Sequence, residues 1–254
     1  MRILLTNDDG YHARGLAVLE RIARTISDDI TVVAPAEEQS GKGRSLTLTE
    51  PFRVRRHAEN RYAVRGTPTD CVMFALAEVM ADAKPDLILS GVNRGGNLAE
   101  DVSYSGTVSA AMEGALAGIR SVALSQRYES TGMGDQVPFD TAEAWGARAL
   151  LPLLDMEWAP RTLVNINFPP VAADAVQGIK PVAQGLRDYG RVAMDKRVDP
   201  RGFTYYWLAM GRLPMVPLPD TDLEAIENGF VTVTPLHLDL THRDSLERLV
   251  GVYS

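Results

Sequence analysis

Two adjacent carboxylates follow the first apolar segment of the chain. Residues 2–6 form a short apolar run typical of a β-strand, and Asn7-Asp8-Asp9-Gly10 come directly after it. Neighbouring acids repel each other unless a positive charge lies between them, and Mg²⁺ and Mn²⁺ prefer carboxylate oxygen ligands. Asn, Asp and Gly are also the residues of an ordinary solvated turn. The pair therefore indicates either a divalent-cation site or a simple turn.

Ligand-type residues recur after another apolar run. Residues 86–90 are typical of a buried strand, and the glycine-rich segment that follows contains Asn93 and Asn97. An Asn side chain offers a neutral oxygen to a metal and an amide N–H to a phosphate oxygen. Ligands of open parallel sheets bind beyond the carboxyl ends of the strands, where this segment and the acid pair would both lie.

Two further segments suit an anion. Ser105-Gly106-Thr107 opens a small-residue helix over 108–116, so its hydroxyls and free backbone N–H groups sit at the positive end of the helix dipole. Ordinary helix capping by Ser105 or Thr107 explains the same residues. Residues 35–45 form a loop rich in glycine, hydroxyl and basic side chains that could approach a phosphate, although the Walker spacing is absent.

The elements that position these loops alternate along the first half of the chain. Apolar, β-branched runs typical of strands lie at 2–6, 30–34, 86–90, 121–125 and 163–168. Helical periodicity is found at 16–26, 69–80, 108–116 and 141–154. This alternation predicts an α/β fold with a largely parallel, doubly wound sheet.

Two regions depart from that alternation. Residues 52–56 and 62–65 predict a β-hairpin excursion, with a turn at Glu59-Asn60. After about residue 171 the composition changes, and Phe203–Met210 predicts an aromatic strand outside the main sheet. Such a strand is expected to pair within its own lobe or to be covered by another subunit.

Composition bounds the function classes. The 254 residues are 45% hydrophobic and 23% charged, which is typical of a soluble globular protein. The net charge of −7 argues against non-specific binding to nucleic acid or anionic membranes, and no stable nucleic-acid complex is expected. Cys71 is the single cysteine, which excludes an intramolecular disulfide. We expect a cytoplasmic protein, since no targeting segment or membrane span is recognisable.

Several ordered motifs resemble one known family. They are Met1–Gly10, Val33-Ala34-Pro35 with Ser40-Gly41, Ser45-Leu46-Thr47, Gly66–Val72, Ser90–Asn93 with Asn97, Tyr104–Gly114, Thr221-Asp222 and Val233–Leu236. Together they resemble the SurE (survival protein E) family of metal-dependent 5′/3′-nucleotidases. The resemblance implies an enzyme that hydrolyses nucleoside 5′- and 3′-monophosphates to nucleoside and phosphate.

The resemblance also implies a fold and a set of site residues. One Mg²⁺ or Mn²⁺ per subunit would be bound by Asp8, Asp9, Ser40 and Asn93, and the phosphate would be lined by Asn97, Ser105, Gly106 and Thr107. Of these, Asp8, Asp9, Asn97 and Ser105 would act in catalysis. Residues 1–170 would form a Rossmann-like metal- and phosphate-binding domain, and residues 171–254 a smaller C-terminal region used in a homodimer or a tetramer.

Three rival functions stay open. An aspartate-nucleophile phosphatase would need acids separated by one residue, whereas Asp8 and Asp9 are adjacent. A dinucleotide-dependent oxidoreductase would carry GxGxxG after the first strand, where this chain has the acid pair. A non-catalytic nucleotide-binding regulatory protein on the same fold would keep the site without turnover.

Other chemically capable residues receive structural interpretations. His12 shows no partner in the sequence, and Asp70 suits a helix cap. Cys71 begins an apolar helical stretch and is expected to be buried. His237 and His242 do not have the spacing of a zinc helix.

Overall fold

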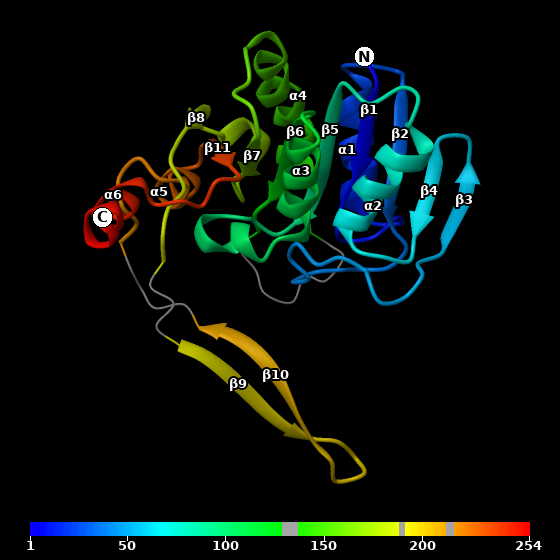
Figure 1. Ribbon diagram of the computed structural model, residues 1–254. Coiled ribbons are helices and arrows are strands. Elements are labelled where there is room, and N and C mark those ends of the chain that lie inside the picture. Colours follow the sequence, from blue (N-terminus) through cyan, green and yellow to red (C-terminus); the bar gives the residue numbers. More distant parts are fainter. Residues whose placement is uncertain (129–136, 188–190, 212–215) are drawn as a thin grey trace.

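The protein is built around one large sheet with helices on both sides (Figure 1). The computed structural model describes residues 1–128, 137–187, 191–211 and 216–254. The main sheet has nine strands in the order β3-β4-β2-β1-β5-β6-β7-β11-β8, and β9 and β10 form a separate pair. This is the mixed, mostly parallel α/β architecture that the sequence predicts.

Three parallel strands at the centre bring the candidate loops together. β1 (Ile3–Thr6) pairs with β2 (Ile30–Pro35) on one side and with β5 (Leu87–Arg94) on the other. Every residue of β1 and β2 is buried, as expected for strands covered on both faces. Their carboxyl ends therefore meet at one edge, where the segments after Thr6, Pro35 and Ser90 lie side by side.

Helices cover the two faces of this sheet. α1 (Arg14–Arg24) and α4 (Asp140–Asp155) pack on one face, and α2 (Pro68–Phe74) and α3 (Gly106–Leu116) on the other (Figure 1). α1 buries an apolar stripe that includes Leu19 and Ile22. The doubly wound arrangement is confirmed.

The remaining strands extend the sheet at both ends. β6 (Arg120–Gln126) and β7 (Thr162–Phe168) continue it in parallel beside β5. β11 (Val231–His237) then pairs antiparallel to β7 and parallel to β8 (Ile179–Pro181). The shorter elements of this second half are Ala99–Ser103, Ala173–Ala175, α5 (Asp222–Glu227) and α6 (Arg243–Tyr253). Two strands that follow residue 170 thus join the same sheet as the first half.

The predicted hairpin excursion is present. β3 (Val54–Ala58) and β4 (Arg61–Val64) pair antiparallel at the sheet edge, and β4 also pairs parallel with β2. All five residues of β3 are exposed, whereas the last two residues of β4 are buried. One side of this hairpin therefore faces solvent close to the loop that follows β2.

Several element boundaries differ from the sequence prediction, most clearly those of α2 and β5. The helix predicted from residue 69 begins at Pro68, because Thr67 and Asp70 form a capping box and a proline suits the first helical turn. It continues through Ala75–Val79 as a π-helix. β5 runs to Arg94 rather than ending at Ser90, because pairing with β6 resumes at Asn93 after an irregularity. Asn93 is therefore part of a strand.

A second hairpin extends away from the main sheet (Figure 1). β9 (Arg191–Val198) and β10 (Thr204–Gly211) pair antiparallel, so the predicted aromatic strand finds its partner within its own lobe. Its apolar side chains remain exposed, including Phe203 at 70% and Leu208 at 63%. None of the helices among the described residues is long and apolar enough to cross a membrane.

Candidate active site

Asp8 lies buried against the start of α3. Its Oδ1 accepts a hydrogen bond from the Thr107 hydroxyl, and its backbone oxygen accepts one of 2.7 Å from the N–H of Gln39. A Cβ at Gly106 would lie 2.9 Å from the Asp8 Cβ, so only glycine allows this approach. Three segments that are far apart in the sequence therefore meet at Asp8.

Asp9 is bound by the end of β5. Its Oδ2 accepts a hydrogen bond of 2.9 Å from the Arg94 N–H, and the Arg94 guanidinium lies 4.0 Å from Oδ1. The same guanidinium bonds Glu38 at 3.1 Å. Arg94 is thus shared among carboxylates from two loops.

The two acids carry an electrostatic cost. Burial raises the pKa of Asp8, and the hydrogen bonds from Thr107 offset this only in part. Burial and then the charge of Asp8 raise the pKa of Asp9 to about 6, despite the bonds from Arg94. A divalent cation would reverse both shifts, because it favours the charged carboxylates. This surplus of buried negative charge fits a hard metal ion.

Ser40 and Asn93 lie one residue from groups bonded to the acid pair. Ser40 follows Gln39, is exposed, and donates its hydroxyl to Glu38 at 2.9 Å. Asn93 precedes Arg94 and donates its amide to the Gly95 carbonyl at 2.9 Å, which leaves its Oδ1 oxygen outside that bond. Neither side chain is hydrogen-bonded to Asp8 or Asp9 in the described structure. The structure brings all four residues of the predicted metal set to one edge.

No group of three or more His, Cys, Asp or Glu side chains that could hold a metal ion lies among the described residues. The predicted set contains only two such residues, and its other two donors are a hydroxyl and an amide oxygen. Such a set suits a hard cation with mixed oxygen ligands rather than zinc.

Asn97 is fixed by a network of buried amides. Its Nδ2 donates to the Ser125 Oγ at 2.8 Å, and its backbone N–H donates to the Asn167 Oδ1 at 2.8 Å. Its carbonyl accepts from both Asn165 and Asn167. No role is predicted from the sequence for these three supporting residues. Two asparagines at alternate positions of one strand were the available signal, since both side chains project from the same face.

The segment before α3 performs the capping role that the sequence left open. The Ser105 side chain accepts a hydrogen bond of 3.0 Å from the Val108 N–H and thereby caps the helix. Its own hydroxyl hydrogen is not used in that bond. The Thr107 hydroxyl is committed to Asp8. The anion-binding capacity of this segment therefore rests on the Ser105 hydroxyl and the first backbone N–H groups of α3.

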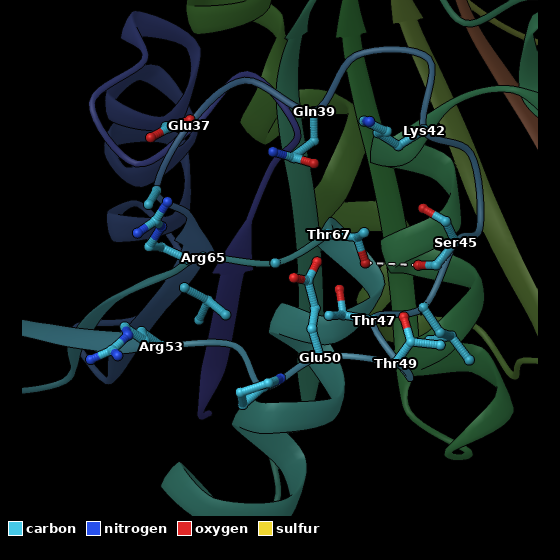
Figure 2. Close-up of a pocket in the computed structure, with 15 residues that line it drawn as sticks. Glu37, Gln39, Lys42, Ser45, Thr47, Thr49, Glu50, Arg53, Arg65 and Thr67 are labelled. Atoms are coloured by element: carbon cyan, nitrogen blue, oxygen red, sulfur yellow. Dashed lines mark hydrogen bonds between the residues drawn. The ribbon is translucent and has the colours of Figure 1, made fainter.

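Two hollows lie beside the loop that follows β2. One has a volume of about 440 Å³ and is lined by residues that include Asp9, His12 and Arg94. The other, of about 530 Å³, lies beneath the loop after β2 and is drawn in Figure 2. Ala36 and Glu37 line both, so the hollows adjoin at this loop.

Asp70, Cys71 and His242, which were interpreted as structural, lie in helix caps or in the core. Asp70 accepts from the Thr67 N–H at 2.8 Å and from the Thr47 hydroxyl at 2.6 Å. Although desolvation acts the other way, these bonds hold the pKa of Asp70 below its usual value. Cys71 is buried, and burial raises the pKa of its thiol well above the usual value. His242 caps α6.

His12 has ring neighbours that the sequence did not show. Its ring lies 5.0 Å from the ring of Tyr11 and 5.7 Å from that of His57, and it lines the hollow that contains Asp9. The sequence showed no partner because His57 comes from the hairpin excursion, 45 residues away by number.

Comparisons with known proteins agree with this geometry. The family model described as "Survival protein SurE" matches residues 3–191. A protein of Rhizorhabdus wittichii named 5′-nucleotidase SurE is 64% identical over 253 residues, covering 100% of both chains. One of Erythrobacter litoralis with the same name is 57% identical and covers 99% of this chain and 98% of the relative. A crystal structure of the SurE protein from Aquifex aeolicus superposes with a TM-score of 0.84 at 38% identity, covering 100% of both chains.

Proposed function

The chain belongs to the Survival protein SurE family, and from this premise we propose that it is a metal-dependent 5′-nucleotidase that also accepts nucleoside 3′-monophosphates. The observation that carries the proposal is the pair of adjacent carboxylates, Asp8 buried and Asp9 half-buried, beside the N-terminus of α3. A cation held by these acids and a phosphate held by the helix would lie next to each other. The relatives named 5′-nucleotidase SurE support this activity.

We propose that Asp8, Asp9, Ser40 and Asn93 hold one Mg²⁺ or Mn²⁺. A bound divalent ion would supply Lewis-acid polarisation of a phosphoryl oxygen. The residues themselves fix the geometry: Thr107 and Gln39 orient Asp8, and Arg94 orients Asp9. Such support from outside the ligand set keeps carboxylates in a productive orientation.

The phosphate would be bound by Asn97, Ser105 and the first turn of α3. Asn97 has a second amide hydrogen beyond the one given to Ser125, and the Ser105 hydroxyl hydrogen is not needed for its cap. Gly106 would present its backbone N–H at the helix start, and Thr107 would act through its bond to Asp8. Donors fixed in this way stabilise the charge that develops on the transferring phosphoryl group. Water would be the acceptor, and the nucleoside hydroxyl would leave.

We further propose that residues 171–254 supply the contacts of a homodimer or a tetramer. The hairpin β9–β10 carries exposed apolar side chains on both strands, among them Met194, Trp207 and Leu208. Apolar surface of this kind marks association sites in soluble proteins. The second half therefore has two roles, since β8 and β11 complete the main sheet.

A phosphate-release screen tests the function. Purified protein is assayed with nucleoside 5′- and 3′-monophosphates in Mg²⁺ or Mn²⁺, with and without EDTA. We expect turnover that EDTA abolishes and that added Mn²⁺ restores. Nucleotide binding without phosphate release would support the alternative, a non-catalytic regulatory protein. The double variant Asp8→Asn/Asn93→Ala is expected to lose both activity and Mn²⁺ binding, whereas Asp82→Asn, at an exposed site, keeps both.

A further inference from the structure

Positive charges without acidic partners cross the outer face of the hairpin β3–β4. Arg53 and Arg65 are neighbours across the hairpin, since the Arg65 N–H donates to the Arg53 carbonyl at 2.8 Å. Both side chains are exposed and line the 530 Å³ hollow. Within the described residues, neither guanidinium forms a hydrogen bond or an ion pair. Ten other arginines of this acidic protein form ion pairs within the described residues, for example Arg21 with Glu143.

The same face leads back to the acid pair. His57 stacks on Tyr11 with ring centroids 4.4 Å apart and lies 5.7 Å from His12, which shares a hollow with Asp9. Partial desolvation and the charges of Arg55 and His12 lower the pKa of His57, so these three groups lie close together. We call His12, His57, Arg55, Arg53 and Arg65 the basic strip. Alternate residues of a strand project from one side at intervals of about 7 Å, which suits repeated contacts with a chain of phosphates.

The hollow at the end of the strip has polar groups suited to a sugar. Figure 2 shows Arg53 and Arg65 on one side, Lys42 and Ser45 on the other, and the Glu50 carboxylate between them. Neither Glu37 nor Glu50 forms an ion pair with Arg53 or Arg65. Carboxylates can accept hydrogen bonds from sugar hydroxyls while the arginines take phosphates. Aromatic rings are absent from its described lining, so a base would stack on a guanidinium plane.

We propose that the basic strip and this hollow bind the leaving-group side of a substrate that carries further phosphates, namely a short single-stranded oligonucleotide with a terminal phosphate. The terminal phosphate lies at the sheet edge beside Asp8 and Asp9, and the next phosphates lie along the basic strip. This inference rests on the proposed function, because it extends the leaving group of the same reaction. It assigns Arg53 and Arg65 to substrate selection, away from the reacting atoms.

The test compares a 5′-phosphorylated dinucleotide with the matching nucleoside 5′-monophosphate. We expect the double variant Arg53→Gln/Arg65→Gln to lower kcat/KM for the dinucleotide about tenfold and to leave the monophosphate within about twofold. In the wild type, log kcat/KM should fall more steeply with log salt for the dinucleotide, by about 0.7 for each added phosphate contact. The matched control Arg148→Gln/Arg248→Gln removes two charges from helices α4 and α6. It should leave kcat/KM unchanged for both substrates.

Two results of this comparison overturn the inference. An equal loss for both substrates would mean that the hollow binds the nucleoside itself, and no loss for either would mean that the strip is solvated surface. Monophosphate turnover by the wild type tests the nucleotidase separately. If the wild type hydrolyses neither substrate, the proposed nucleotidase function is wrong. Fluorescence anisotropy of a 3′-labelled dinucleotide then tests separately whether the basic strip binds it. Weaker binding by the arginine variant then supports the inference, and unchanged binding overturns it.

Discussion

The sheet edge that carries Asp8 and Asp9 has too little positive charge, whereas the hairpin β9–β10 leaves apolar side chains uncovered. Asp8 and Asp9 are buried charges whose surroundings supply too little positive charge, as their raised pKa values show. Trp207 and Leu208 are apolar side chains left 61% and 63% exposed. Each feature costs the isolated chain stability, and each would be relieved by the partner we propose: a cation in one case and a second subunit in the other. The comparison teaches that a local departure from stable packing indicates what the protein binds.

Removing one buried charge tests the comparison most severely. Asp8→Asn keeps the shape of the side chain but halves the charge of the pair. We expect kcat to fall about a thousandfold, because a main charged ligand and the orientation of the site are lost together. Phosphate release and Mn²⁺ titration by calorimetry measure the two effects.

The exposed Asp82→Asn substitution is the control for this change. Full activity in Asp8→Asn would show that the acid pair is an ordinary turn. A loss of activity with unchanged Mn²⁺ affinity would separate catalysis from metal binding.

The close approach of α3 to Asp8 gives the next largest effect. In Gly106→Ala, the new Cβ would meet the Asp8 Cβ at 2.9 Å, Asp8 Oδ2 at 3.0 Å and Pro68 Cγ at 3.1 Å. Both the acid and the helix start must shift, so we expect a loss of about a hundredfold in kcat/KM and of about 1–3 kcal/mol in stability. Steady-state kinetics and thermal unfolding measure these losses.

Gly251→Ala in α6 is the matched control, because a Cβ there meets nothing within 4 Å. It should be neutral or slightly stabilising in a helix. A neutral Gly106→Ala would mean that the helix N-terminus does not need its present distance from Asp8.

Local sequence patterns were enough to predict the positions of the acids but not their partners. The acid pair directly follows an apolar β-branched run, so its place at a strand end follows from periodicity alone. Its bonds to Thr107 and Arg94 span 99 and 85 residues, and no local pattern reports such distances. The metal and phosphate assignments stay predictions, since they come from family resemblance and await the experiments above.

The strands β8 and β9 were not predicted, for different physical reasons. β8 has three residues, too few to show alternation. β9 reads Arg-Val-Ala-Met-Asp-Lys-Arg-Val, with charges where a buried strand would be apolar. It is a strand because β10 pairs with it along its whole length, so its signal lies in the aromatic partner rather than in its own composition.

The raised pKa of Asp9 predicts that the metal-free protein becomes more stable as pH falls. The pKa of Asp9 is raised from 3.8 to about 6, so the metal-free folded state holds a proton that the unfolded state releases between these values. Stability therefore increases as pH falls through about 6 and is lowest above it. The shift is worth about 3 kcal/mol for Asp9. Unfolding of the EDTA-treated protein, measured from about pH 7.5 to pH 5, should show about half of this gain, because the rest appears only as pH falls toward 3.8.

Mn²⁺ sharpens the same test, because it competes with protons for the carboxylates. Its stabilising effect should be large at about pH 7.5 and small at about pH 5. In Asp9→Asn the metal-free pH response should flatten. A response in Asp9→Asn equal to that of the wild type would place the titrating group elsewhere.

The hairpin gives the smallest effect, on assembly rather than on chemistry. Leu208→Glu places a charge on the exposed apolar face of β10, and we expect a cost of about 1–2 kcal/mol at each copy of the contact, since a buried leucine contributes about that much. Light scattering over a dilution series should show subunits dissociating at concentrations where the wild type is assembled. Leu240→Glu makes the same change at a side chain that is 93% exposed in a loop and should leave assembly intact. If both variants assemble like the wild type, the exposed hairpin does not hold subunits together, and the parallel with the acid pair fails.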